Sequence, residues 1–196
     1  MSTSETAYHH GSLRSALLGA AMQAIEGADG TLPSLRELAR TVGVSPAAVY
    51  RHFPDKNALL AAIGEEGVHM LGAAQQSAYD EAGGGIAGFA GTGRAYVRFA
   101  LAHPALFRLV FAHGPAFPSP SKASDPASDL LRRTTVELTG GGPAAETLAL
   151  RAWAIAHGIA MLMLDGRLAP EDGLIDRLLD TQTLIPRQGS SSDESP

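Results

Sequence analysis

The sequence of 196 residues contains no cysteine, a single tryptophan and only 18% charged residues. Without cysteine the chain has neither disulfides nor thiolate metal sites, which fits a reducing compartment. No uninterrupted apolar run of about 18 residues occurs, and no charged, apolar and small-residue signal precedes Tyr8. We therefore expect a cytoplasmic protein of one or two domains that does not associate with membranes.

The sequence also lacks a set of residues that would converge into a catalytic site. His9 and His10 are adjacent, but neighbouring residues rarely chelate one ion, and no suitably spaced carboxylate or histidine joins them. The serines at 190–192 lie in a polar stretch near the carboxy end, where nothing predicts a framework around them. We expect a protein that is not an enzyme and that holds no metal and no cofactor.

The most informative pattern in the chain lies in residues 34–63. Ser34 is followed by an apolar stripe at helical spacing: Leu35, Leu38, Ala39 and Val42. Glu37 completes a capping box with Ser34, Gly43 follows the last residue of the stripe, and Ser45 caps a second helix. Two short helices joined by a tight turn predict a helix-turn-helix, whose second helix enters the major groove of DNA.

The second helix carries no acidic residue on the face that we expect to be exposed. Its apolar residues Val44, Val49 and Phe53 are expected to pack against the first helix. The remaining positions are small, hydrogen-bonding or cationic: Ser45, Ala47, Ala48, Tyr50, Arg51 and His52. The alternative is a helical hairpin with a solvated outer face, but such faces usually carry several Glu and Lys. This face therefore favours a polyanionic partner.

Two cations are expected where the helix dipole disfavours them. Asp55 is predicted to cap a third helix with Lys56 in its first turn, and Ser12 to cap the first helix with Arg14 in its first turn. Either cation alone could be a surface residue that tolerates a penalty of a few tenths of a kcal/mol. Two of them beside a helix-turn-helix favour phosphate binding.

Residues 8–71 resemble the DNA-binding domain of the tetracycline-repressor (TetR) family of bacterial transcriptional regulators. The residues that carry the resemblance are Tyr8-His9-His10-Gly11, Leu13-Arg14, Leu38-Ala39, Val42-Gly43-Val44-Ser45, Val49-Tyr50-Arg51-His52-Phe53, Lys56 and Leu59-Leu60. The resemblance implies that phosphates are contacted by Tyr50, His52 and Lys56. It implies that base edges are reached by Ser45, Ala47, Ala48 and Arg51. The expected DNA-binding set is completed by His10, Arg14 and Ser34.

The charge of the chain is distributed unevenly. The net charge is −5, but residues 1–56 contain five Lys or Arg and five Asp or Glu, whereas residues 57–196 contain ten and fifteen. The expected DNA-binding part is therefore neutral, which predicts modest non-specific affinity and a shallow salt dependence. Because Ala47 and Ala48 offer only apolar contact, hydrogen-bonded base readout would depend mainly on Ser45 and Arg51.

Glycine and proline divide the rest of the chain, in which we find no credible strand and no repeat. We expect an all-α fold whose helices cover about 56–79, two segments within 89–112, 129–138, 143–165 and 171–184, with a long loop over 113–128. The expected organisation is a disordered arm (1–7), a three-helix helix-turn-helix domain (8–56), a helical ligand-binding and dimerisation domain (57–185) and a disordered tail (186–196).

The segment from Pro143 to Asp165 is apolar on two sides. One stripe is Leu148, Ala152, Ile155, Ile159 and Leu162, and the other is Leu150, Trp153, His157, Met161 and Leu164. A helix that is apolar on two sides is buried on two sides. Either both stripes belong to one core, or one forms a two-fold dimer interface, which we favour. The expected interface is Leu148, Ala152, Ile155, Ile159, Leu162, Leu174 and Leu178.

A second resemblance covers about residues 94–165. Trp153-x-x-x-His157-Gly158, together with His103-Pro104-x-Leu106-Phe107-Arg108, resembles the WHG-type regulatory domain of one branch of the same family. Relatives bind small molecules between these helices, and occupancy alters the separation of the DNA-binding domains. The candidate lining residues are Phe99, Phe107, Phe111, Trp153, His157 and Met161. Equally, Trp153 and His157 could be core residues; if a pocket exists, it favours a hydrophobic or aromatic effector.

These patterns and resemblances together predict a ligand-responsive DNA-binding transcriptional regulator. The expected partners are a near-palindromic double-stranded operator, a second copy of the chain and an unidentified small hydrophobic effector, with repression as the expected outcome. The alternative is a helix-turn-helix protein that acts only through other proteins. Arg14 and Lys56 argue against it, since a protein-binding module has no reason to place both cations at helix amino termini.

Overall fold

The computed structural model describes residues 4–27, 30–113 and 125–180, and it describes side chains for all of these except residues 4–12 and His113. Within these ranges every element is an α-helix, which confirms the predicted all-α class. The helices are α1 (Ser4–Gly27), α2 (Leu35–Val42), α3 (Pro46–His52), α4 (Lys56–Glu81), α5 (Gly85–Ala102), α6 (Pro104–His113), α7 (Pro126–Thr139), α8 (Gly142–Leu164) and α9 (Asp172–Leu178).

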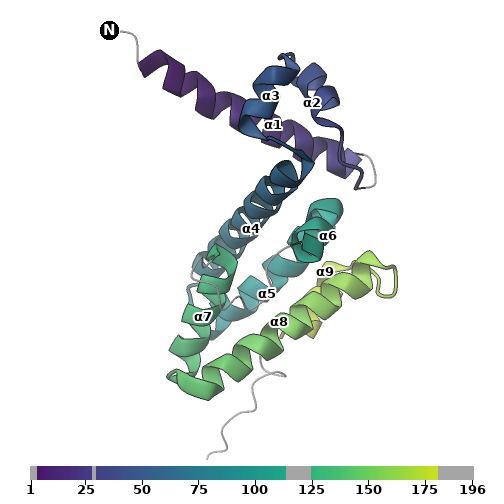
Figure 1. Cartoon of the computed structure of the whole chain (residues 1–196). Coiled ribbons are helices and arrows are strands. Elements are labelled where there is room, and N and C mark those ends of the chain that lie inside the picture. The colour runs from purple at the N-terminus through teal and green to yellow at the C-terminus, as the bar shows by residue number, and fades with distance from the viewer. Residues whose placement is uncertain (1–3, 28–29, 114–124, 181–196) are drawn as a thin grey trace, which may run out of the picture.

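The helices form a head and a body that share one long helix. Figure 1 shows α1, α2 and α3 together at one end of the molecule, with α4 running from this head down into the body of α5 to α9. Leu59 and Ile63 of α4 are fully buried among the head residues, whereas Leu71 of the same helix is buried farther along, in the body. One continuous helix therefore links the two parts.

The predicted helix-turn-helix is present, with the predicted caps. The Ser34 hydroxyl accepts a hydrogen bond from the backbone N–H of Glu37 (3.2 Å), while the Glu37 carboxylate accepts one from the backbone N–H of Ser34 (2.8 Å). Gly43 follows α2 with φ of 78°, a left-handed conformation that glycine adopts without steric cost. Ser45 caps α3 by accepting from the N–H of Ala48 (3.3 Å).

Several boundaries differ from the prediction. The first helix begins at Ser4, within the segment 1–7 that was expected to be an arm, and Ser12 lies inside it rather than at its cap. The helix α7 begins at Pro126, within the expected loop, because Asp125 accepts a hydrogen bond from the N–H of Ser128 and Pro126 suits a first helical turn. The expected tail lies outside the described residues.

Two glycines of α4 allow direct contact with the helices of the body. A Cβ on Gly67 would lie 2.7 Å from Cγ2 of Val110 in α6. A Cβ on Gly72 would lie 2.7 Å from Cβ of Pro126 and 3.0 Å from the backbone N of Ala127, at the start of α7. Real Cβ atoms do not tolerate such separations, so α4 packs against α6 and α7 only because these two residues lack side chains.

We expect Gly72→Ala to lower the free energy of unfolding by about 1–3 kcal/mol, because the added methyl meets the rigid backbone of α7. The matched control is Gly64→Ala in the same helix, where the nearest atom would be 3.9 Å away. That control should stabilise the protein by about 0.5–1 kcal/mol through the higher helix propensity of alanine. Urea unfolding followed by circular dichroism measures both values. Equal effects of the two variants would contradict close packing at Gly72.

Candidate nucleic-acid interface and internal cavity

The exposed face of α3 contains most of the residues that the sequence analysis placed there. Ser45, Ala47, Tyr50 and Arg51 are exposed, and Tyr50 retains 45% of its accessible surface. Ala48 is the exception, since it is buried at 7% exposure beside Val49. The prediction that Ala48 faces outward is therefore wrong. It lies three residues after the cap, on the same side of the helix as Val49, which packs into the head core.

The hydroxyl of Ser45 has a double role in this geometry. Its oxygen accepts the hydrogen bond that caps α3, which leaves its hydrogen available to a further acceptor. Arg51 is exposed in the last turn of the same helix, where a cation is favoured by the helix dipole. Ser45 and Arg51 therefore place two hydrogen-bond donors at opposite ends of the exposed face of α3.

Lys56 lies in the first turn of α4, as predicted. Asp55 caps the helix by accepting from the N–H of Ala58 at 2.8 Å. The ammonium of Lys56 donates to the backbone carbonyl of Leu32 at 3.4 Å, a long hydrogen bond to the segment before α2. Lys56 is nevertheless exposed. Its ammonium has three donors, so this contact leaves donors for another partner.

Arg14 is not at a helix amino terminus. Because α1 begins at Ser4, Arg14 lies within the helix, and the argument that placed it in a first turn is wrong. Its guanidinium carbon lies 5.4 Å from the ring centre of Phe53, the residue that ends α3, and Arg14 remains exposed. Arg14 therefore places a cation near the junction of α3 and α4, although it does so from the middle of a helix and not from its amino terminus.

The predicted His10 also belongs to α1, but its side chain lies outside the described residues.

The other two predicted positions have local structural roles. Ser34 is exposed and participates in the capping box of α2. His52, the last residue of α3, is half-buried, whereas its neighbour Arg51 is exposed.

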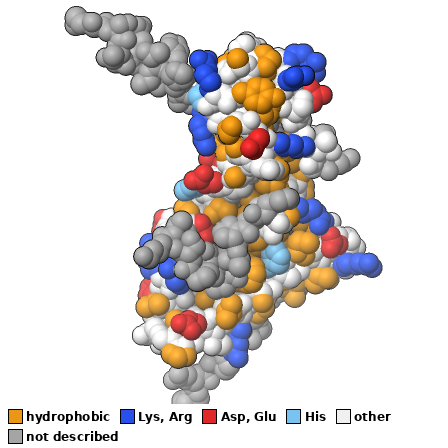
Figure 2. All heavy atoms as spheres, viewed as in Figure 1, with side chains coloured by type: hydrophobic (Ala, Val, Ile, Leu, Met, Phe, Trp, Pro, Cys, Tyr) orange, Lys and Arg blue, Asp and Glu red, His pale blue; other side chains and the backbone are white. Residues whose placement is uncertain are grey.

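No cation of the head forms a salt bridge within the described residues, whereas four of the eight described arginines of the body do: Arg94, Arg98, Arg108 and Arg132. Among the described residues, no salt bridge involves the five cations of the head, which are Arg14, Arg36, Arg40, Arg51 and Lys56, and Figure 2 shows blue side chains on both sides of it. In the body, Arg98 pairs with Asp172 at 2.8 Å and Arg108 with Asp165 at 2.6 Å. The head therefore offers cations that form no salt bridge among the described residues, although Arg40 lies near enough to Glu37 to help lower the pKa of that carboxyl.

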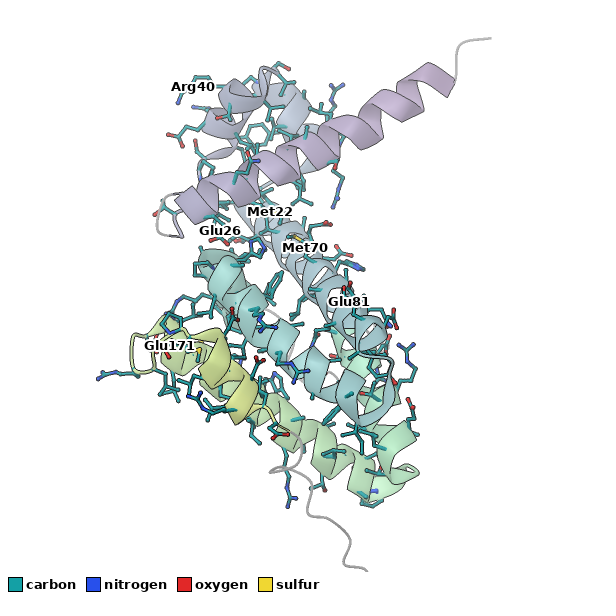
Figure 3. All side chains as sticks on the ribbon, turned by 180° about the vertical axis from the view of Figure 1, so that it is seen from behind. Met22, Glu26, Arg40, Met70, Glu81 and Glu171 are labelled. Atoms are coloured by element: carbon teal, nitrogen blue, oxygen red, sulfur yellow. The ribbon has the colours of Figure 1, made fainter. Side chains whose placement is uncertain are left out.

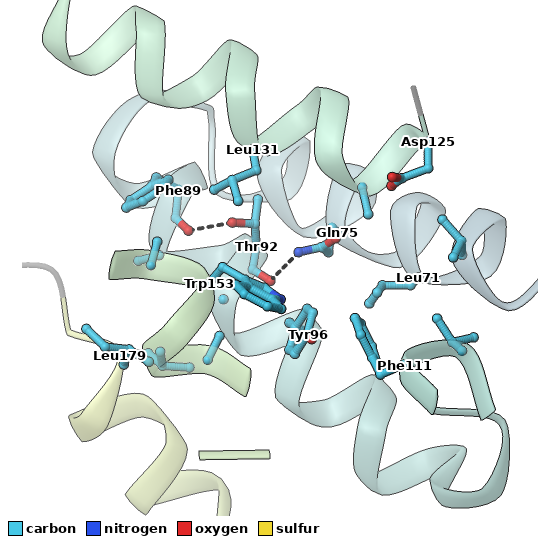
Figure 4. A pocket seen from close by; sticks show the side chains of 18 residues that line it. Leu71, Gln75, Phe89, Thr92, Tyr96, Phe111, Asp125, Leu131, Trp153 and Leu179 are labelled. Carbon is cyan, nitrogen blue, oxygen red and sulfur yellow. Dashed lines mark hydrogen bonds between the residues drawn. The ribbon is translucent and has the colours of Figure 1, made fainter. Parts of the chain in front are cut away.

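The body contains a cavity of about 80 Å³ between α4, α5, α6, α7 and α8. Its wall is mainly apolar and aromatic, and Figure 4 shows the side chains that surround it. The lining residues are Val68, Leu71, Gln75, Phe89, Ala90, Thr92, Gly93, Tyr96, Val110, Phe111, Asp125, Ala127, Leu131, Ala152, Trp153, Ile155, Ala156 and Leu179. An apolar cavity of roughly 150 Å³ holds a benzene molecule, so this one is smaller than a cavity that encloses a whole ring.

Two of the six predicted lining residues, Phe111 and Trp153, line this cavity. The other four do not: Phe99, Phe107, His157 and Met161. Phe107 is fully buried behind the wall and meets the Tyr96 ring edge-on at 5.4 Å, and His157 lies 4.9 Å from the Phe111 ring. These side chains therefore support the aromatic wall from behind.

Tyr96 connects the cavity wall to His157. Its hydroxyl lies 2.9 Å from Nδ1 of His157. Burial raises the pKa of Tyr96, although the Trp153 indole opposes this, and burial lowers the pKa of His157. The Tyr96 hydroxyl therefore keeps its proton, and with the neutral tautomer of His157 whose Nδ1 carries no hydrogen it donates a hydrogen bond to that atom. This hydrogen bond holds the Tyr96 ring in place.

The part of the wall that comes from α4 and the start of α5 was not predicted from the sequence. Gln75 is 8% exposed and Thr92 is 6% exposed, and both line the cavity. The available signal was Gln75 itself, a polar residue one helical turn after Leu71 on the buried side of a helix that was interpreted as a connector. Among the described residues, no group of three His, Asp or Glu is arranged to hold a metal ion.

Only some of the residues predicted for the dimer interface are exposed on α8 and α9. Ile159 is buried, and Ala152 and Ile155 line the cavity, so the middle of the predicted stripe faces the protomer's own body. Leu162 and Leu178 are exposed as expected, and Leu148 and Leu174 are half-buried. Both faces of α8 are apolar, so periodicity alone does not say which residues face inward within one protomer.

The outer face of α8 carries large apolar side chains that the described residues leave exposed. Leu150 is 48% exposed and Leu162 is 45% exposed, and a Cβ on Gly158 would meet no atom within 4 Å. By length and hydropathy α8 could cross a membrane, and 28% of its most apolar window is buried.

Glu26 connects the head to the body. This residue lies near the end of α1, and its carboxylate accepts hydrogen bonds from the backbone N–H groups of Ala105 (3.2 Å) and Leu106 (2.9 Å) in the first turn of α6. Figure 3 labels Glu26 at the junction between the two parts. A carboxylate is favoured at a helix amino terminus by the helix dipole as well as by these bonds. Since Val110 and Phe111 of α6 line the cavity, one helix contacts both the cavity and the head.

Comparisons with known proteins agree with this architecture. A family model described as bacterial regulatory proteins of the tetR family matches residues 17–63, and a model of the tetracyclin repressor-like C-terminal domain matches residues 89–183. None of the curated proteins compared with the chain matches it.

Two solved structures are similar over most of the chain. A protein with unknown function from Rhodococcus sp. RHA1 is 40% identical, with a TM-score of 0.70 over 89% of this chain and 95% of that one. A TetR family transcription regulator from Marinobacter aquaeolei VT8 is 17% identical, with a TM-score of 0.51 over 85% of this chain and 91% of that one. The second similarity concerns the fold alone.

Proposed function

The chain belongs to the tetR family of bacterial regulatory proteins and is a DNA-binding transcriptional regulator, and we propose that it is a ligand-responsive homodimeric repressor in the cytoplasm. In this proposal α3 of each copy enters the major groove of one half of a near-palindromic operator. A small apolar effector fills the cavity of the body and favours a separation of the two heads that does not fit the operator.

The observation that carries the proposal is the chemistry of the exposed face of α3. Ser45 and Arg51 offer hydrogen-bond donors, and Ala47 between them offers an apolar surface that fits a thymine methyl. Tyr50, Arg14 and Lys56 are exposed beside this face and suit phosphate contacts. The five cations of the head, none of which pairs with an acid among the described residues, support a polyanionic partner.

We expect Lys56→Ala to weaken binding to all DNA sequences alike and to reduce the slope of log affinity against log salt by about 1, because one phosphate contact is lost. Arg51→Ala should relax the preference at particular bases, at a cost of about 1–3 kcal/mol on the best site. Binding-site selection from random DNA, followed by titrations at several salt concentrations, measures both effects.

The control for these variants is Arg98→Ala, which removes an arginine that already pairs with Asp172 and Asp176 in the body. It should leave DNA affinity and base preference unchanged. If Arg51→Ala selected the same sites as the wild type, the assignment of base readout to Arg51 would be wrong.

The proposed dimer contact is the outer face of α8, together with Leu178 of α9. Leu150, Gly158 and Leu162 form an apolar strip in which a glycine permits close approach of another helix. A two-fold contact of this strip with its copy buries the apolar surface that a single protomer leaves exposed. Two linked heads then provide the two DNA contacts that a palindromic operator requires.

We expect Leu150→Glu to convert the dimer into a monomer, because an isologous contact would bury one unpaired carboxylate from each copy. Light scattering of the purified protein gives the mass directly. The matched control is Ile86→Glu, since Ile86 is 54% exposed on α5 and lies outside the strip. A dimer that persists in Leu150→Glu, or a wild type that is monomeric at micromolar concentration, would refute this interface.

The response to ligand is supported by the small size of the cavity and by Glu26. A ring that enters the cavity contacts and displaces a wall that includes Val110 and Phe111 of α6 in this proposal. The first turn of α6 is bound to Glu26 of α1, so displacement of α6 reaches the head through two hydrogen bonds. An effector that prefers the displaced state by 100-fold shifts the equilibrium by about 2.7 kcal/mol.

We expect Glu26→Ala to reduce the ligand-induced loss of operator affinity several-fold, because α6 would then move without displacing α1. The affinity of the ligand for the cavity should stay within about twofold, since Glu26 is not part of the wall. Operator titrations with and without ligand measure the coupling. Glu66→Ala on the exposed surface of α4 is the control. A full ligand effect in Glu26→Ala would show that another contact carries the coupling.

A further inference from the structure

Gln75 has an unusual position in the cavity wall. It is 8% exposed, and its Nε2 donates to the backbone carbonyl of Thr92 at 3.3 Å, as drawn in Figure 4. This bond determines the orientation of the amide, because the reverse orientation would set Oε1 against the carbonyl oxygen of Thr92. The Oε1 atom, in contrast, is buried and has no hydrogen-bond donor among the described residues.

The other polar side chains of the wall already have partners. The Thr92 hydroxyl donates to the carbonyl of Phe89 at 2.7 Å, and the Tyr96 hydroxyl bonds to His157. The Asp125 carboxylate accepts from the N–H of Ser128. A buried carbonyl without a donor costs about 1–3 kcal/mol, which a ligand that supplies the donor recovers.

The charge of the wall restricts the ligand further. Within the described part of the chain, Asp125 is the only charged residue that lines the cavity, and none of the lining residues described is Lys or Arg. An anionic ligand would therefore be desolvated without a cationic partner, and its charge would be repelled by Asp125.

We propose that Gln75 Oε1 is the recognition point for the effector, which is a neutral, single-ring apolar molecule that carries a hydroxyl donor. The apolar wall binds the ring, and the hydroxyl donates to Gln75. A phenol has this chemistry, since its hydroxyl keeps its proton at neutral pH. This inference rests on the proposed response to ligands, and it narrows the ligand to one chemical class.

The test compares para-ethylphenol with its isomer para-methylanisole, which has the same atoms but lacks the donor. Trp153 is the only tryptophan of the chain and lines the cavity, so its fluorescence reports binding directly. The full-length wild type should bind the phenol about tenfold more tightly than the anisole, the difference that one hydrogen bond to a buried acceptor provides. The matching carboxylic acid, para-methylbenzoate, should bind more weakly than either.

The variant that isolates the contact is Gln75→Leu, which keeps the size of the side chain. It should bring the affinity ratio of phenol to anisole close to one. Gln76→Leu is the matched control, because Gln76 is the next residue and bonds instead to Asp80 and Arg133 on the surface. It should keep the tenfold preference, and circular dichroism checks that both variants fold.

The outcomes separate this inference from the proposed function. Equal binding of the two isomers to the wild type, or an unchanged preference in Gln75→Leu, overturns the role of Gln75 and leaves a ligand-binding regulator in place. Failure of both isomers to bind, while the protein still binds its selected operator, overturns the ligand class. Failure to bind any DNA sequence would instead refute the proposed regulator.

Discussion

The direct contact of α4 with α6 and α7 at Gly67 and Gly72 is the constraint on which the rest of the structure depends. Where a helix approaches its neighbours without intervening side chains, it cannot slide along them without new clashes. The same helix contributes Leu59 and Ile63 to the head core and Gln75 to the cavity. A change in the cavity wall is therefore transmitted through a packed helix, with Glu26 as a second connection between the parts.

The body combines a tightly packed shell with a small, mainly apolar cavity. The inner face of α8 is built largely from small residues, which bring it close to α5 and α7: Ala145, Ala149, Ala156 and Ala160. Behind the wall, Phe107 and His157 pack against Tyr96 and limit the movement of α5. Phe107 belongs to α6, and this helix also contacts Gly67 of α4 and Glu26 of α1, so α6 is the element that joins the cavity to the head.

The sequence predicted the features that depend on local interactions and missed those that depend on packing. The capping box at Ser34, the glycine end of α2 and the cap at Ser45 involve neighbours within four residues, so they could be recognised in the sequence and are present. Ser12 fails as a cap because the helix continues past it in both directions. Gln75 could not be assigned to the cavity, since the position of α4 beside α5 depends on contacts distant in sequence.

The outer strip of α8 and the exposed face of α3 differ in chemistry. This difference suits them to different kinds of partner. The outer strip of α8 is apolar and interrupted by Gly158, which suits a second helix. The face of α3 is polar, and the cations around it pair with no acid among the described residues. Because α8 belongs to the body and α3 to the head at the other end of α4 (Figure 1), a dimer formed through α8 leaves α3 uncovered. The proposed dimer contact is therefore compatible with DNA binding by both heads at once.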